Sequence, residues 1–242
     1  MQITHSPTRL LVAGALALTL AGCGTAASSP EAHPAAASSP EAHPATATEA
    51  HPTDASDASV ATHLRDPNPY QYLPKVPAFR LASTSVLPGR PLPPAQLSKL
   101  LGAPGGQDRS PELSWSGFPK AAKSFVVSMY DPQAPTGSGF WHWVVIDIPG
   151  TTTSLPLDAG DPNSAALPSG AVQLADDAGL HQYVGGAPPA GSGVHDYYLT
   201  VTALDVASTG LPATASPAYT GFAIDAHTIA RATIVCPTAA GA

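Results

Sequence analysis

The chain has 242 residues, enough for one or two domains, and it is rich in proline (28) and glycine (21), while aromatic residues make up only 6%. Its formal net charge is −7, from 10 Lys and Arg against 17 Asp and Glu, and no basic run is present. This charge pattern excludes nucleic-acid binding through clustered cations and membrane binding through a polybasic surface. The two cysteines, Cys23 and Cys236, do not have the spacing of a zinc site.

Residues 1–22 have the pattern of a signal peptide. The apolar run Leu10–Leu20 follows Arg9 and is too short to span a bilayer. The quartet Leu20-Ala21-Gly22-Cys23 resembles a bacterial lipobox, whose cysteine receives a diacylglyceryl group. We therefore expect lipidation of Cys23 and attachment to the cell membrane, outside the cytoplasm, in a bacterial cell envelope. An ordinary cleaved signal and an uncleaved anchor are the alternatives.

A low-complexity tether is expected over residues 23–65. The segment Ser28–Ala35 recurs at Ser38–Ala45, and Glu49-Ala50-His51-Pro52 repeats part of it. Ala, Ser, Thr and Pro bury too little apolar surface to offset the entropy lost on ordering. The sequence therefore predicts a disordered Pro/Ala/Ser-rich linker that joins the lipid anchor to one folded domain, residues 66–242.

The folded domain is expected to be mostly β. Short β-prone runs alternate with Gly/Pro turns, which favours an antiparallel sandwich over βαβ units; the runs are 79–83, 124–130, 142–148 and 195–204. A helix is expected near the end, over 217–231, followed by a last strand over 232–236.

Three of these strands carry polar residues at the end of an apolar face, because side chains alternate across a strand. Asp131 continues the face of Phe125, Val127 and Met129; His142 begins that of Val144, Ile146 and Ile148; His195 and Tyr197 precede Leu199, Val201 and Ala203. If the three strands are neighbours, their polar ends form one patch at the rim of the core.

A set of ordered motifs resembles the phosphatidylethanolamine-binding protein family, in particular its bacterial YbhB/YbcL-like (Raf kinase inhibitor-like) branch. The motifs are Ser110–Trp115, Asp131–Pro135, Gly139–Trp143, Tyr183–Pro189 and His195–Tyr197. The resemblance implies an antiparallel β-sandwich with a large sheet, a small sheet, short helices and a C-terminal helix.

The resemblance also implies a small pocket that binds phosphate or a phospholipid headgroup without metal or cofactor. Carried over by motif, its polar side chains are Asp131, His142, His195 and Tyr197, and its lining residues are Pro135, Phe140, Ala187 and Pro189. The chain departs from the family in having Gln133 where Asp is usual, and Asp196 where Arg is usual. The second departure reverses a charge close to the pocket.

The expected function is therefore that of a membrane-anchored binding protein that is not an enzyme. Both imidazoles are expected to donate hydrogen bonds to the anion, while Asp131 orients a histidine or receives the ammonium of an ethanolamine. Two alternatives remain open: a regulator that inhibits a partner enzyme or protease, and a His/Asp-dependent hydrolase or metal enzyme. Ser192 is not expected to act as a nucleophile, because it lacks a strand–turn–helix context. A homodimer and a protein partner are also left open.

Overall fold

The computed structural model of this chain describes residues 68–241, which form two antiparallel β-sheets. The small sheet has the order β1-β2-β5, with β1 at Arg80–Ala82, β2 at Leu113–Ser116 and β5 at Ser154–Leu155. The large sheet has the order β6-β4-β3-β7-β8, and its strands are β3 Ser124–Asp131, β4 Phe140–Pro149, β6 Val172–Gln173, β7 Val194–Leu204 and β8 Thr228–Ala239. A short 3-10 helix, η1, spans Pro94–Gln96. The expected mostly-β fold with a large and a small sheet is confirmed.

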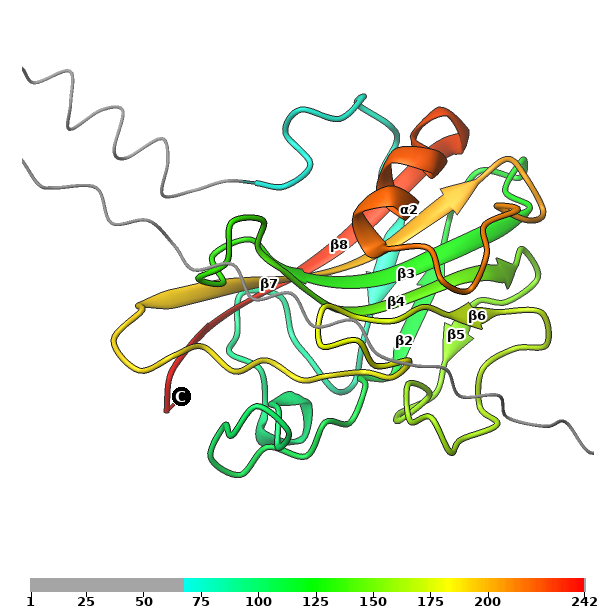
Figure 1. The fold of residues 1–242 in the computed structure, drawn as a ribbon. Helices are drawn as coiled ribbons and strands as arrows, with labels where there is room; N and C mark the ends of the chain where they lie inside the picture. Colours follow the sequence, from blue (N-terminus) through cyan, green and yellow to red (C-terminus); the bar gives the residue numbers. More distant parts are fainter. Residues whose placement is uncertain (1–67, 242) are drawn as a thin grey trace, which may run out of the picture. The chain divides into compact units, whose positions relative to one another are not determined.

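Figure 1 shows the strands of the small sheet on one side of the large sheet and α2 (Pro217–Ile224) on the other. The main core lies between the sheets, where fully buried side chains from both pack together; they include Leu113, Trp115 and Leu155 from the small sheet and Phe125, Val127, Leu199 and Val201 from the large one. Such burial supplies the main stabilisation of the sandwich.

The C-terminal helix is shorter than the sequence pattern predicts. Ser216 caps α2 by accepting a hydrogen bond from the backbone of Tyr219, and the helix ends at Ile224. A 3-10 turn, η2 (Asp225–His227), follows, and β8 begins at Thr228. The expected helix over 217–231 is therefore wrong over residues 225–231. The β-branched residues from Thr228 onward pair with β7 along its whole length, and this pairing overrides the helical pattern.

Two β-bulges in β4 break the alternation that the sequence predicts. Near Pro149, two steps along β3 correspond to three steps along β4, and Asp147 has a φ of 57° in the left-handed region. As a result, Ile148 packs in the core between the sheets, while Val144 and Ile146 pack in the second cluster together with Ile224 of α2. The prediction that Val144, Ile146 and Ile148 share one face is therefore wrong.

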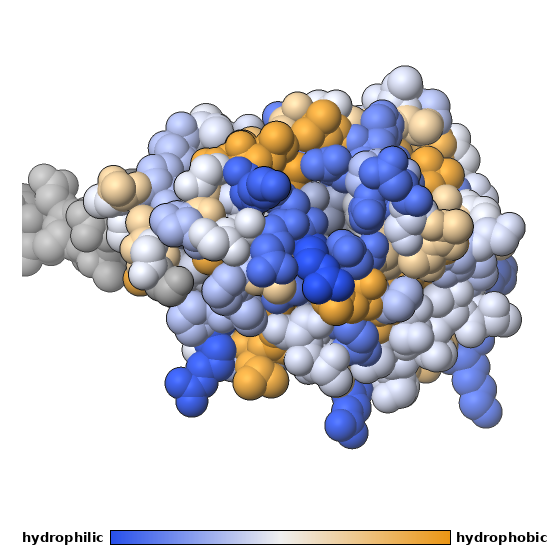
Figure 2. Space-filling view, turned by 90° about the horizontal axis from the view of Figure 1, so that it is seen from below, coloured by the Kyte–Doolittle hydropathy of each residue, from blue (hydrophilic) through white to orange (hydrophobic). Residues whose placement is uncertain are grey.

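Two of the expected segments, the signal peptide at 1–22 and the tether at 23–65 with its lipidated Cys23, lie outside the described residues. Among residues 68–241, no helix combines the length and the hydrophobicity that crossing a membrane requires. On the face drawn in Figure 2, hydrophilic residues gather at the centre and separate smaller hydrophobic areas. That face therefore offers a mixed surface and not a continuous apolar one.

Candidate ligand-binding site

The strands bring Asp131, His142, His195 and Tyr197 to one end of the large sheet. Asp131 is the last residue of β3, and His195 and Tyr197 lie at the start of β7. Since β3 and β7 are antiparallel and Tyr130 pairs with Tyr198, the end of one strand lies beside the start of the other. The four residues are at most 3% exposed. The polar ends of three strands thus meet inside the fold.

His142 reaches this site because of the second bulge in β4. Met129 pairs with Trp143 while the next residue of β3, Tyr130, pairs with Trp141, so His142 is the extra residue between them. Its ring lies 5.3 Å from that of Tyr197, measured between centroids. A bulge next to a functional site commonly re-aims one side chain in this way. Simple alternation would have left His142 on the face of Val144 instead.

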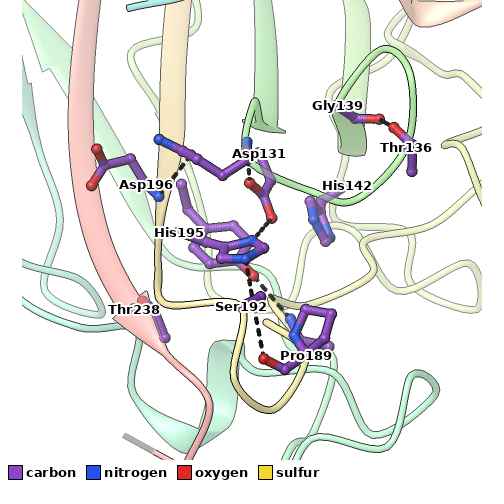
Figure 3. Close-up of polar contacts among 12 residues, drawn as sticks. Asp131, Thr136, Gly139, His142, Pro189, Ser192, His195, Asp196 and Thr238 are labelled. Carbon is purple, nitrogen blue, oxygen red and sulfur yellow. Dashed lines mark hydrogen bonds and ion pairs between the residues drawn. The ribbon is translucent and has the colours of Figure 1, made fainter. Parts of the chain in front are cut away.

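A chain of hydrogen bonds runs from Asp131 through His195 to the surface (Figure 3). The Nδ1 atom of His195 lies 2.7 Å from Oδ2 of Asp131, and its Nε2 atom lies 2.8 Å from Oγ of Ser192. The hydroxyl of Ser192 has a second partner, the carbonyl oxygen of Pro189, at 2.7 Å. Because a carboxylate only accepts, Nδ1 carries the proton and Nε2 is the ring atom that faces the outside.

The protonation of His142 is fixed by its backbone partner. Nδ1 donates to the carbonyl oxygen of Val184 at 3.0 Å, and burial lowers the pKa of the imidazole to about 4. Near neutral pH, Nε2 therefore carries a lone pair, and it is buried without a hydrogen-bond partner. This differs from the expectation that both imidazoles donate to an anion, because His142 offers an acceptor instead.

Tyr197 is held by the glycine-proline loop that follows Val184. Its hydroxyl accepts a hydrogen bond from the backbone N–H of Ala187 at 3.1 Å. Burial, and then the nearby charge of Asp131, raise the pKa of the phenol, so it stays protonated. A Cβ on Gly186 would lie 2.8 Å from Cζ of Tyr197, which explains why this loop needs glycine for its close approach.

The two residues that depart from the family pattern lie directly beside the site. The second carboxylate oxygen of Asp131 accepts the backbone N–H of Gln133 at 2.9 Å. The side chain of Gln133 in turn accepts the backbone N–H of Asp196 at 3.0 Å, which ties the loop after β3 to β7. The carboxylate of Asp196 is directed away from His195 (Figure 3). Gln133 therefore has a positioning role that its neutral amide can fill.

Three of the four expected lining residues contact the site. The ring of Phe140 lies 4.7 Å from that of His142, while Ala187 and Pro189 bond to Tyr197 and Ser192 through their backbones. Pro135 is exposed on the loop between β3 and β4. A groove of about 610 Å³ beside the site is lined mainly by apolar residues: Leu97, Leu101, Ala103, Pro104, Ala187, Pro188, Pro189 and Ala190 among them. The four polar side chains do not line it, so His195 reaches the surface through Ser192.

The thiol of Cys236 and the two other imidazoles of residues 68–241, those of His181 and His227, form no hydrogen bond with the four site residues, although Cys236 is the partner of Tyr197 across β7 and β8. Cys236 is fully buried, and burial raises the pKa of its thiol to about 11, which keeps it protonated and unreactive. His227 pairs with Asp205 at 3.0 Å on the surface, and His181 bonds to the backbone of Gln173. Within the described residues, no group of three His, Cys, Asp or Glu side chains is arranged to hold a metal ion.

The sequence pattern does not predict the contact of Ser192 with His195. Ser192 lacks the strand–turn–helix context of a nucleophile elbow and lies in a glycine loop three residues before His195. That short spacing within a turn was the available signal, because a turn can fold a side chain back onto the strand that follows it.

The chain is similar to known proteins over this whole region. The profile of the family described as phosphatidylethanolamine-binding protein matches residues 82–238. The chain is 42% identical to UPF0098 protein YbcL of Escherichia coli (strain K12) over 157 residues, 65% of this chain and 85% of that protein. It is 41% identical to UPF0098 protein YbhB of the same organism over 156 residues, 64% of this chain and 97% of that protein.

Two solved structures have a similar fold. The crystal structure of Escherichia coli YbcL matches with a TM-score of 0.64 and 40% identity, and covers 66% of this chain and 98% of that one. The Chlamydia trachomatis homologue CT736 matches with a TM-score of 0.54 and 29% identity, and covers 66% of this chain and 96% of that one. The residues that match the family, 82–238, include β3, β4 and β7, the strands that carry the site.

Proposed function

Because the chain belongs to the phosphatidylethanolamine-binding protein family, we propose that the site of Asp131, His142, His195 and Tyr197 binds a phosphate-type oxyanion such as a phospholipid headgroup. The observation that carries the proposal is the orientation of His195. Its Nδ1 is held by Asp131, so its Nε2 points toward the exposed Ser192. A ligand oxygen that takes the place of the Ser192 hydroxyl would meet this nitrogen.

The charge of the site determines how an anion is held. No lysine or arginine takes part in the hydrogen bonds and ion pairs of these four side chains within residues 68–241. An oxyanion is therefore held by hydrogen bonds and not by a lysine or arginine charge, and Nε2 of His195 donates to the ligand when it carries a proton.

The lone pair of His142 supports a ligand that also brings a donor. Nε2 of His142 is buried and unpartnered, and a buried acceptor without a partner is costly. A zwitterionic headgroup such as phosphoethanolamine carries both groups, an oxyanion for His195 and an ammonium for His142. A monoprotonated phosphate, with its P–OH group, offers the same combination.

Calorimetric titration of the full chain tests this function with inorganic phosphate and with glycerophosphoethanolamine. We expect His195→Ala to abolish binding of both compounds, because it removes the ring nitrogen that meets the ligand oxygen. His227→Ala, which removes an imidazole from the exposed pair with Asp205, is the matched control. Affinity that is unchanged in His195→Ala would refute the proposal.

We also propose that the chain is anchored to the membrane through Cys23. The support is the Leu20-Ala21-Gly22-Cys23 quartet after the apolar run Leu10–Leu20. Metabolic labelling with palmitate should mark the wild type but not Cys23→Ala, and the variant should leave the membrane fraction. A mature N-terminus other than a lipid-modified Cys23, measured by mass spectrometry, would exclude this anchor.

A further inference from the structure

The serine over His195 has the surroundings of a reactive hydroxyl. Ser192 is exposed, and it lies between Gly191 and Gly193, which have φ values of 79° and 89°. Its Oγ atom is 2.8 Å from Nε2 of His195, which is itself 1% exposed. Asp131, 3% exposed, holds the other ring nitrogen at 2.7 Å. The accessible hydroxyl of Ser192 therefore lies at the outer end of the buried Asp131–His195 pair.

The proton positions suit activation of this hydroxyl. With Nδ1–H donated to Asp131, the neutral ring of His195 has its lone pair on Nε2, where it can take the proton of Ser192. The hydroxyl has a second acceptor, the carbonyl of Pro189 at 2.7 Å, so its one proton is shared between two partners. A nucleophile within reach of a base that a third group orients is the arrangement that defines a Ser-His-Asp triad on unrelated folds.

Two backbone N–H groups of the loop have no hydrogen-bond acceptor among residues 68–241. Within the described residues, the backbone N–H groups of Gly191 and Gly193 donate no hydrogen bond, and both flank Ser192 in the chain. Free N–H groups beside a nucleophile are what stabilises the negative charge of a tetrahedral intermediate. The groove next to the loop, which Pro189 and Ala190 line together with Leu97 and Leu101, is mainly apolar.

We propose that Ser192 is a nucleophile, with His195 as its base and Asp131 as the orienting carboxylate, and that it accepts the acyl group of a small uncharged carboxylic ester. When both imidazoles are neutral, the only formal charge among these side chains is the negative charge of Asp131, so an uncharged ester meets no repulsion. The apolar groove beside the loop can take up the hydrocarbon part of the ester. This activity goes beyond binding and departs from the expectation of a protein that only binds.

The reaction balances with water as the only co-reactant. Oγ of Ser192 forms a bond to the ester carbonyl carbon while its proton passes to Nε2 of His195. The bond from that carbon to the alkoxy oxygen breaks, and the proton moves from Nε2 to the leaving alcohol. The acyl group remains on Ser192 as an ester. Water then attacks it, gives a proton to Nε2, and restores the hydroxyl as the carboxylic acid leaves.

The test uses p-nitrophenyl acetate and the full chain. We expect a burst of p-nitrophenol and an added acetyl group that peptide mapping locates on Ser192. Ser192→Ala should lose both signals, and Asp131→Asn should slow acylation by about 100-fold, the usual loss when general base catalysis fails. Ser208→Ala is the matched control and should keep the wild-type rate. Ser208 is also exposed, but its hydroxyl donates to the carboxylate of Asp147 and not to an imidazole.

The outcomes separate this inference from the proposed binding function. Acetylation that persists in Ser192→Ala, or that spreads over lysines or rests on His195, overturns the inference, as does a rate unchanged in Asp131→Asn. Thermal melting of each variant establishes that a lost signal is not a lost fold. A wild type that binds phosphate but is not acylated refutes only the nucleophile, whereas one that is acylated but binds no phosphate refutes only the anion site.

Discussion

Asp131 and His195 form a buried pair, with Oδ2 of the carboxylate 2.7 Å from Nδ1 of the imidazole, although 64 residues separate them in the chain. The surface of the same fold carries a second pair of this kind, His227 and Asp205 at 3.0 Å, whose side chains are 48% and 47% exposed. Comparing the two pairs shows how much burial changes the contribution of an Asp–His pair to the stability of the fold.

Asp131→Asn should lower the free energy of unfolding by about 3 kcal/mol, because it leaves a buried imidazole without its carboxylate. Asp205→Asn should lower it by less than about 1 kcal/mol, because exposed pairs are screened by water. Denaturant unfolding at neutral pH measures both values. Equal losses in the two variants would mean that burial of the Asp131–His195 pair contributes nothing to its strength.

His142 should make the fold sensitive to acid. Burial lowers its pKa from 6.5 to about 4, so the unfolded chain binds the proton more readily than the folded one. Stability from this group is complete above pH 6.5 and is lost as the pH falls toward 4, by about 3 kcal/mol in all. The difference in unfolding free energy between wild type and His142→Gln, measured across this range, should shrink by that amount on acidification. A constant difference would contradict the assignment of His142 as a neutral acceptor.

Asp176 should act in the opposite direction over nearly the same range. Its carboxylate is 4% exposed, and burial raises its pKa from 3.8 to about 6. The folded state then binds the proton more readily, so this group stabilises the fold as the pH falls from 6 toward 3.8, by about 3 kcal/mol. Asp176→Asn should remove that gain, so the variant should lose stability on acidification more steeply than the wild type. Parallel pH profiles would show that the carboxylate is ionised throughout.

The strands β3 and β7 and their two polar ends could be predicted from the sequence, because the apolar alternation of these strands is unbroken. Phe125, Val127 and Met129 lead to Asp131, and the face of Leu199 and Val201 leads back to Tyr197. Alternation in these strands is a local property, which the sequence carries.

The features that the sequence does not predict depend on contacts between segments that are distant in the chain or on the path of a turn. The bulge that turns His142 into the site arises where β4 pairs with β3, and no residue type marks it in the sequence. The end of α2 at Ile224 depends in the same way on the pairing of β8 with β7, and the contact of Ser192 with His195 depends on the path of one turn. Tertiary contacts outweigh local propensity at each of these places.

Gly186→Ala should disturb the site through Tyr197. The added Cβ would lie 2.8 Å from Cζ of Tyr197 and 2.7 Å from Cδ1 of Leu92, both in the packed core, so these groups must shift. We expect a loss of about 1–3 kcal/mol in the free energy of unfolding, typical of overpacking, together with weaker phosphate binding. Gly221→Ala is the matched control: its Cβ meets nothing within 4 Å and lies inside α2, where alanine should stabilise the fold by about 0.5–1 kcal/mol. Thermal or denaturant unfolding measures both changes. Equal effects of the two substitutions would show that Tyr197 tolerates displacement and that the close approach of Gly186 does not hold the phenol in place.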